Sequence, residues 1–216
     1  MAPKLFIDKV SPPCRAVLMC AKAIGFNLDV VEISLVERDH LKPEFIKLNP
    51  LHTVPVLDDN GFVLYDSHAI MPYLIAKYAK DKSLYPEDIQ KRALIDQRLH
   101  FDSGLLFARY VRLSIPILMD TLKRISDEDV RVLNEAYGFF NTILEQSKYV
   151  AGEELSIADF SLLNTVINSN AVVPLDERVY THIKAWKDRL RALPYYEIIV
   201  AGGDLYGSVI KKKLSS

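Results

Sequence analysis

The stretch "KLFIDKVSPPCRAVLMCAKAIG", residues 4–25, decides the fold because two periodicities meet inside it. Its first part, "KLFIDKV", is typical of a short buried strand. After Ser11, apolar residues recur at the spacing of one side of a helix, at Val17, Cys20, Ala21 and Ile24. Gly25 then ends the helix, as glycine commonly does just past a helix C-cap. A strand that leads directly into a helix predicts an α/β domain.

The segments that follow extend this domain to about residue 80. "FNLDVVEIS" (26–34) predicts a second strand, and "HLKPEFIKLNP" (40–50) predicts a short helix. "TVPVLDDNGFVLYD" (53–66) is typical of a hairpin, with Asp59, Asn60 and Gly61 in its turn. A third helix is expected from the N-cap Ser67 onward. The order βαβ, α, ββα requires one mixed sheet with helices packed on it.

The second half of the chain, residues 87–216, is predicted to be all helical. The polar stretch "DKSLYPED" (81–88) marks the boundary. Residues 89–125 read as one long helix or two, with Pro116 forcing a kink or a break. Capping signals at Ser126 and Ser156 start two further helices, and residues 179–193 form an amphipathic helix that ends before Pro194. The Ser156/Asp159 pair is expected to support folding rather than chemistry.

Composition excludes several classes of function. Lysine and arginine number 27 against 28 aspartates and glutamates, which argues against nucleic acid or an anionic membrane as a main partner. We find no apolar stretch suited to a signal peptide or a membrane span. Cys14 and Cys20 point to different sides of one helix, so they form neither a disulfide nor a metal pair. A reduced, cytoplasmic and metal-free protein is expected.

Ser11 is the first of three candidate sites. "SPPC" looks like the thiol-disulfide motif Cys-x-x-Cys with its first cysteine replaced by Ser11 and its second kept as Cys14. A residue between a strand and a helix places its hydroxyl beside free backbone N–H groups and the positive end of the helix dipole. That environment stabilises an anion, including a thiolate. The alternative is a plain N-cap followed by Pro12 at the favoured first helical position.

Two further stretches offer binding groups for an extended ligand. If the Val54–Pro55 bond is cis, the backbone N–H and C=O of Val54 face outward and can pair with an extended peptide; the alternative is an ordinary trans proline at an edge strand. The amide N–H groups of Ser67 and His68 can donate hydrogen bonds to a carboxylate, and Asp66 can hold an ammonium group beside it. The alternative is a capped helix with a surface acid. Together, the three stretches describe a receptor for a small zwitterionic peptide that carries a thiol.

The sequence resembles the cytosolic glutathione S-transferases, and in particular the insect serine-dependent enzymes of the epsilon class. The similar segments span the whole chain: "SPPCRAV" (11–17), "DHLKPEF" (39–45), "HTVPVLDD" (52–59), "SHAI" (67–70), "LYP" (84–86), "HFDSGLLFAR" (100–109), "LSIADFS" (155–161) and "LPYYE" (193–197). The resemblance implies a thioredoxin-like glutathione-binding domain over residues 1–80. It also implies an all-helical domain over residues 87–216 that contributes a hydrophobic substrate pocket.

The resemblance also implies roles for single residues in binding the co-substrate glutathione. Ser11 matches the catalytic serine that donates a hydrogen bond to the glutathione sulfur. The other matching residues are Val54 and Pro55 for the cysteinyl unit, Asp66, Ser67 and the neighbouring His68 for the γ-glutamyl unit, and His40 and His52 near the glycyl carboxylate. The chain departs from the insect pattern at Asp66, where glutamate is usual, and at Leu51, where glutamine is usual. Because of both departures, we do not expect this chain to have the glutathione affinity that is typical of the insect enzymes.

The substrate pocket and the reaction are implied in the same way. The expected pocket faces Ser11 and is lined by Pro13, Phe107, Tyr110, Arg112, Leu113 and Ile117, with Arg109 as an alternative to Arg112. Because the apolar members follow helical spacing, they are also a reasonable core stripe. The implied enzyme is a cytoplasmic homodimer that adds glutathione to small hydrophobic electrophiles in detoxification. The resemblance also implies insecticide dehydrochlorination, with the thiolate as a base, and peroxidase activity toward lipid hydroperoxides. The alternatives are a non-enzymatic binder of hydrophobic ligands or hormones and a thiol-disulfide oxidoreductase that uses Cys14.

Overall fold

A mixed four-stranded sheet forms the first half of the computed structural model, which describes residues 2–215. The strands are β1 (Lys4–Ile7), β2 (Asp29–Glu32), β3 (Val56–Asp59) and β4 (Phe62–Tyr65). In the order β2-β1-β3-β4, β1 pairs with β2 in parallel and with β3 antiparallel, and the β3–β4 pair is an antiparallel hairpin. The mixed sheet of a thioredoxin-like domain is therefore confirmed.

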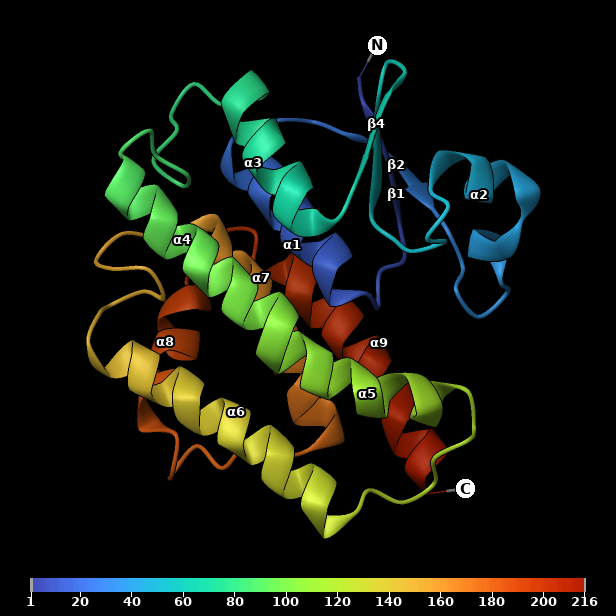
Figure 1. The fold of residues 1–216 in the computed structure, drawn as a ribbon, viewed down its shortest axis with the longest axis vertical. Helices are drawn as coiled ribbons and strands as arrows, with labels where there is room; N and C mark the ends of the chain where they lie inside the picture. Colours follow the sequence, from blue (N-terminus) through green and yellow to red (C-terminus); the bar gives the residue numbers. More distant parts are fainter. Residues whose placement is uncertain (1, 216) are drawn as a thin grey trace.

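Helices cover both faces of this sheet (Figure 1). α1 (Pro12–Ala23) and α3 (Ser67–Tyr78) lie on the face that meets the second half of the chain, and α2 (Pro43–Leu48) lies on the other face. A 3₁₀ turn, η1 (Asp39–Leu41), precedes α2. The N-cap of α3 is Asp66 rather than Ser67, because the carboxylate Oδ1 of Asp66 accepts the amide N–H of His68 at 2.8 Å.

The second half of the chain is helical. Its elements are α4 (Ile89–Phe101), the π-helical turn η2 (Asp102–Leu106), α5 (Phe107–Leu118), α6 (Asp127–Glu145), α7 (Ile157–Val172), α8 (Thr181–Leu190) and α9 (Glu197–Leu214). The irregularity in the long helix lies at η2 and not at Pro116. Pro116 falls in the last turn of α5, where it lacks the N–H that would donate to the carbonyl of Arg112, and the helix ends two residues later at Leu118.

α7 is the central helix, because it packs against α1 and α3 of the first half and against α4, α5 and α9 of the second. Almost every residue of α7 is buried, including polar ones such as Asn164 and Asn168. A helix buried on all sides must satisfy its polar groups inside the protein. The hydrogen bonds of these asparagines, described below, connect the two halves of the chain.

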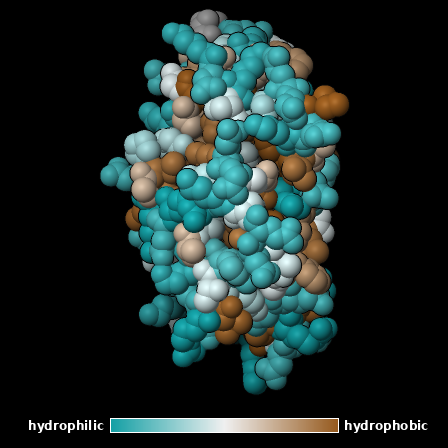
Figure 2. Space-filling model, turned by 90° about the vertical axis from the view of Figure 1, so that its left-hand side faces the viewer, coloured by the Kyte–Doolittle hydropathy of each residue, from teal (hydrophilic) through white to brown (hydrophobic). Residues whose placement is uncertain are grey.

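The surface is mixed in character. On the face shown in Figure 2, hydrophilic side chains predominate, and apolar ones gather in separate groups in the upper half. Within residues 2–215, we find no helix that is both long enough and apolar enough to cross a membrane.

Candidate functional site

The strand register brings the three candidate stretches to one edge of the sheet. Val56 pairs with Phe6 on one side and with Tyr65 on the other. Val54 precedes Val56 by two residues, while Asp8 follows Phe6 and Ser67 follows Tyr65 by two, so the three stretches leave the sheet at the same end. Neighbouring strands lie about 4.8 Å apart. An extended ligand laid across this edge would therefore reach the loop that ends at Ser11, the backbone of Val54, and the start of α3.

Ser11 occupies the N-cap position of α1, but its hydroxyl makes no capping hydrogen bond. The predicted surroundings of this hydroxyl need one correction. Since Pro12 and Pro13 have no N–H group, the first turn of α1 offers fewer free donors than an ordinary helix start. The partly exposed Ser11 side chain therefore caps no backbone N–H of the helix, and its hydroxyl can turn toward a ligand.

Cys14 is fully buried in the core, three residues after Ser11. Burial raises the pKa of its thiol to about 12, although a hydrogen bond with the Ser11 side chain acts in the opposite direction. At pH 7 a thiol with this pKa is ionised in about one molecule in 10⁵, and only the thiolate is a nucleophile. The second cysteine, Cys20, is also buried and unpaired. The geometry therefore does not support a redox role for Cys14.

The Val54–Pro55 peptide bond is cis. Among the described residues, neither the N–H nor the C=O group of Val54 makes a hydrogen bond, so both groups are free to pair with a ligand. The preceding loop is held by Asn49, whose amide donates to the carbonyl of Thr53 at 2.9 Å and to its hydroxyl at 3.0 Å. Asn49 is fully buried. Sequence reasoning missed this residue and used it only as a helix stop.

His40 and His52 come together, with ring centroids 6.2 Å apart. His40 lies on η1, and its Nδ1 is buried without a hydrogen-bond partner. Burial and the neighbouring His52 both lower the pKa of His40, which favours the neutral ring. His52 is exposed and has a positive φ of 46°. The pair therefore offers polar ring nitrogens next to the Val54 loop.

Asp66 and Ser67 lie at the far end of the same edge. Asp66 has a φ of 75°, and its Oδ1 caps α3 through the amide of His68. That amide was predicted to accept a ligand carboxylate, but the structure assigns it to Asp66 instead. Oδ2 of the exposed Asp66 faces no partner among the described residues, while Ser67 is the first residue of α3 and is buried. Asp66 and Ser67 thus stay candidate ligand contacts.

The His68 ring points into the second half of the chain rather than toward the sheet edge. Its Nε2 lies 2.7 Å from the hydroxyl of Ser161, and that hydroxyl donates to Oδ2 of Asp102 at 2.6 Å. Oδ2 of Asp102 also accepts from Thr165 at 3.2 Å, while Oδ1 is buried without a partner. His68 is therefore a connection between α3 and α7. The predicted contact of His68 with the γ-glutamyl unit was through its backbone amide and does not involve this ring.

Comparison with known proteins identifies the family. Residues 5–82 match the glutathione S-transferase N-terminal domain, and residues 96–194 match the glutathione S-transferase C-terminal domain. Glutathione S-transferase D7 of Anopheles gambiae is 39% identical to this chain, over 99% of each protein. The chain belongs to the glutathione S-transferase family. Glutathione, from which the family takes its name, is the co-substrate of these enzymes.

Solved structures agree with this assignment. An epsilon-class glutathione S-transferase from the housefly, Musca domestica, is 38% identical, covers 98% of both chains and superposes with a TM-score of 0.95. A glutathione transferase homologue from Drosophila mojavensis, solved with bound glutathione, is 40% identical and also has a TM-score of 0.95, covering 98% of this chain and 97% of that one.

The predicted substrate pocket of this glutathione S-transferase needs correction. Tyr110, Leu113 and Ile117 are buried in the core, and the Tyr110 hydroxyl is bonded to Ser114 and Asn168 at 3.2 Å each. The stripe is therefore the core side of α5, which the same spacing also allowed. The partly buried Pro13 and Phe107 remain accessible.

The two arginines considered for the pocket mouth both turn toward α6. The guanidinium of Arg109 donates to the Val132 carbonyl at 2.7 Å and pairs with Glu135 at 2.8 Å. Arg112 is largely exposed, and its closest acidic partner is Asp129 at 3.8 Å. Arg112 is therefore free to move, whereas Arg109 is held.

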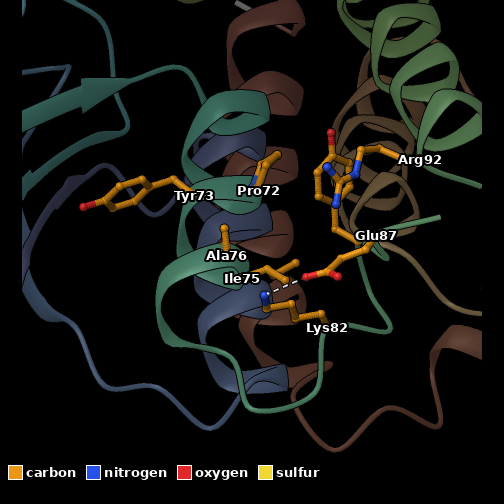
Figure 3. A pocket seen from close by; sticks show the side chains of 8 residues that line it. Pro72, Tyr73, Ile75, Ala76, Lys82, Glu87 and Arg92 are labelled. Atoms are coloured by element: carbon orange, nitrogen blue, oxygen red, sulfur yellow. Dashed lines mark hydrogen bonds and ion pairs between the residues drawn. The ribbon is translucent and has the colours of Figure 1, made fainter. Parts of the chain in front are cut away.

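A separate groove of about 600 Å³ lies between α3 and the start of α4 (Figure 3). Lys82 and Glu87 form an ion pair of 3.0 Å across it, while Tyr73 points away from it. Arg92 lies 4.8 Å from the ring centre of Tyr85. Ser11 is not among the residues that line this groove, so it is distinct from the candidate site. Within residues 2–215, we find no cluster of side chains suited to a metal ion.

Proposed function

We propose that this glutathione S-transferase binds glutathione along the sheet edge and that the Ser11 hydroxyl stabilises its thiolate. The observation that carries the proposal is the position of the partly exposed Ser11, whose hydroxyl lies at the N-terminus of α1 without capping it. Two features support the placement of the ligand: the free backbone groups of Val54 and the buried start of α3 at Ser67. His40 and His52 are the proposed contacts for the glycyl carboxylate.

The energy required for this role is modest. A free thiol has a pKa near ~8.5 and is mostly protonated at neutral pH, and lowering that pKa by ~2 units takes ~2.7 kcal/mol. One charge-assisted hydrogen bond contributes ~1.5–3 kcal/mol, and the end of a helix dipole contributes ~0.3–1 kcal/mol. Ser11 and α1 together therefore supply enough stabilisation. No metal or second nucleophile is required.

The proposed reaction is nucleophilic attack by the thiolate sulfur on an electrophilic carbon, from which the leaving group departs with its electron pair. Holding glutathione and the electrophile together in one site contributes a second part of the rate enhancement. We place the hydrophobic electrophile beside Ser11, against Pro13 and Phe107, with Arg112 at the mouth. Insecticides and lipid hydroperoxides are the proposed substrate classes. With a lipid hydroperoxide, the thiolate would attack the terminal peroxide oxygen, and the lipid alkoxide would leave and take up a proton to give the alcohol. A second glutathione would then displace water from the resulting sulfenic acid to give glutathione disulfide. With a chlorinated insecticide, the thiolate would act as a base.

A pH titration of bound glutathione, followed by ultraviolet thiolate absorbance, tests the role of Ser11. We expect a thiol pKa well below that of free glutathione in the wild type and a value close to the free one in Ser11→Ala. The matched control is Cys14→Ala, which should keep the low pKa. If Cys14→Ala instead removes the absorbance change, the oxidoreductase hypothesis gains support and the proposal fails.

The same titration tests the alternative of a non-enzymatic binder. Two observations favour that alternative: one carboxylate oxygen of Asp66 is already bonded to its own helix, and Leu51 is 58% exposed where the insect pattern has glutamine. Glutathione that binds without ionising would establish it. Turnover of a chlorinated aromatic electrophile, lost in Ser11→Ala, would exclude it.

We also propose that the protein is a cytoplasmic homodimer, as expected from its family. Light scattering at micromolar concentration should give twice the mass of one chain. A stable monomer would remove this claim without affecting the role of Ser11.

A further inference from the structure

Arg15 is a buried charged residue in the first turn of α1, only 1% exposed. Burial lowers the pKa of its guanidinium to about 10, so the group still carries its charge at neutral pH. Its NH1 donates to the carbonyl of Lys9 and to the carbonyl of Val10, at 3.1 Å each. These two carbonyls belong to the loop directly before Ser11. Arg15 therefore holds that loop from the interior of the protein.

The other side of the guanidinium is held by α7. Its Nε donates to Oδ1 of Asn164 at 2.8 Å, and its NH2 donates to Oδ1 of Asn168 at 2.5 Å. The amide of Asn168 in turn donates to the carbonyl of Val10 at 3.0 Å. The Val10 carbonyl thus receives one hydrogen bond from each half of the chain. Both asparagines are fully buried, which makes this network costly to disturb.

α9 also contacts this network, through Gly202, which lies against Lys9 and Arg15. A Cβ atom at this position would collide with the carbonyl oxygen of Lys9 and would lie 2.7 Å from Cδ of Arg15. Real Cβ atoms do not approach other atoms so closely, so the loop and the helix can meet only because residue 202 is glycine. Three helices, α1, α7 and α9, therefore fix the backbone of Lys9 and Val10.

We propose that Arg15 is a positioning residue for the transfer reaction: with Asn168, it holds the Lys9 and Val10 carbonyls and thereby places the Ser11 hydroxyl against the ligand sulfur. This inference rests on the proposed role of Ser11. A displacement of about 1 Å at a reacting group costs on the order of 100-fold in rate. Glutathione affinity depends mainly on Val54 and Ser67, which this network does not touch. Loss of positioning should therefore lower kcat and raise the thiol pKa, with little change in the KM for glutathione.

Two adjacent glycines provide a matched test. Gly202→Ala forces the Lys9 backbone to move, whereas Gly203→Ala meets only Cγ2 of Ile167, at 2.7 Å, inside the helical half. Both changes crowd α9, but only the first displaces the loop before Ser11. We expect kcat of Gly202→Ala to fall about 10- to 100-fold and the thiol pKa of bound glutathione to rise. Gly203→Ala should change kcat less than about threefold and leave that thiol pKa in place.

A second pair approaches the network from α7. Asn168→Ala removes the hydrogen bonds to Arg15 and Val10 and a further one to Tyr110. Ser169→Ala removes the bond from the serine hydroxyl to the Val166 carbonyl and an interaction with Tyr137, neither of which involves Arg15 or Val10. Asn168→Ala should reproduce the loss of kcat and the raised thiol pKa, and Ser169→Ala should not. Arg15→Lys keeps the charge but replaces the planar fork of donors, so we expect it to resemble Asn168→Ala rather than the wild type.

The outcomes separate the two proposals. If Ser11→Ala raises the thiol pKa while Gly202→Ala and Asn168→Ala behave like their controls, Gly203→Ala and Ser169→Ala, the positioning role is overturned and the role of Ser11 stands. If Ser11→Ala leaves the thiol pKa low, the role of Ser11 fails and the positioning role fails with it. Should Arg15→Lys not fold, the glycine pair decides the question by itself.

Discussion

Replacing Asp159 with alanine should be among the most destabilising single changes in this protein. The fully buried carboxylate accepts four hydrogen bonds. Oδ1 accepts from the Val150 amide at 3.0 Å and the Trp186 indole at 2.9 Å, and Oδ2 accepts from the amide and hydroxyl of Ser156 at 2.9 and 3.0 Å. The bond from the Ser156 amide is one half of the capping box of α7, while the two bonds to Oδ1 connect α7 to the preceding loop and to α8.

The magnitude follows from the donors that would be left behind. Val150 and Trp186 are buried, and each unsatisfied buried donor costs about 1–3 kcal/mol. Loss of the cap adds about 1 kcal/mol. We therefore expect Asp159→Ala to lower the free energy of unfolding by about 3–7 kcal/mol, which is a large part of the usual 5–15 kcal/mol. Ser156→Ala should cost only about 1 kcal/mol.

Urea unfolding followed by the fluorescence of Trp186, the single tryptophan, measures this change directly. The control is Asp188→Ala, because Asp188 forms ion pairs with Lys184 and Arg191 at the exposed surface of α8. Surface pairs contribute about 0–1 kcal/mol. If Asp159→Ala shifts the urea midpoint no further than Asp188→Ala does, the reasoning from buried donors is wrong.

Three further predictions concern the first half of the chain. Cys14→Ala should keep kcat/KM within about twofold and lower the free energy of unfolding by about 1–2 kcal/mol, because the thiol fills core space; kinetics and urea unfolding test this, and loss of activity would revive a redox role. Asn49→Ala should weaken glutathione binding about tenfold by releasing Thr53 beside the binding edge, as the loss of about one net hydrogen bond would give; calorimetry measures the Kd, and an unchanged value would contradict the assigned role. Burial raises the pKa of Asp59, but hydrogen bonds, first among them that from Lys77, outweigh it and hold the pKa well below its usual 3.8. A depressed carboxylate pKa stabilises the fold above 3.8 and loses that effect as the pH falls, so the wild type should lose stability more steeply than Asp59→Asn below about pH 4 in acid unfolding followed by circular dichroism; parallel curves would show that Asp59 contributes nothing.

Local signals in the sequence predicted the sheet and its helices well. The change from strand to helix period around Ser11 and the turn Asp59–Gly61 are set by neighbouring residues, so a single sequence reveals them. The start of α3 was predicted one residue late. Asp66 caps that helix with a positive φ, a conformation that propensity alone does not predict.

The predicted electrophile pocket shows where periodicity stops being informative. Tyr110, Leu113 and Ile117 lie on one side of α5, as their spacing indicates, but spacing does not say what that side faces. In the structure it faces the core, where Tyr110 reaches Asn168 of α7. Whether this side of α5 lines a pocket or packs in the core depends on how segments distant in the sequence pack. The spacing of residues within one helix does not show that packing.

Arg15 marks the boundary between what could and could not be predicted. It lies in a helix whose neighbouring residues are nearly all apolar, so a buried and therefore paired charge was predictable. α7 poses the complementary problem, because Asn164 and Asn168 stand four residues apart in a helix that is buried on every side. A buried cation and two buried amides each need partners, and the structure shows that they satisfy one another across separations of 149 and 153 residues. The need for a partner can be inferred from the sequence around each of these residues, but which residues pair is set by the fold. The loop that this network holds leads directly to Ser11.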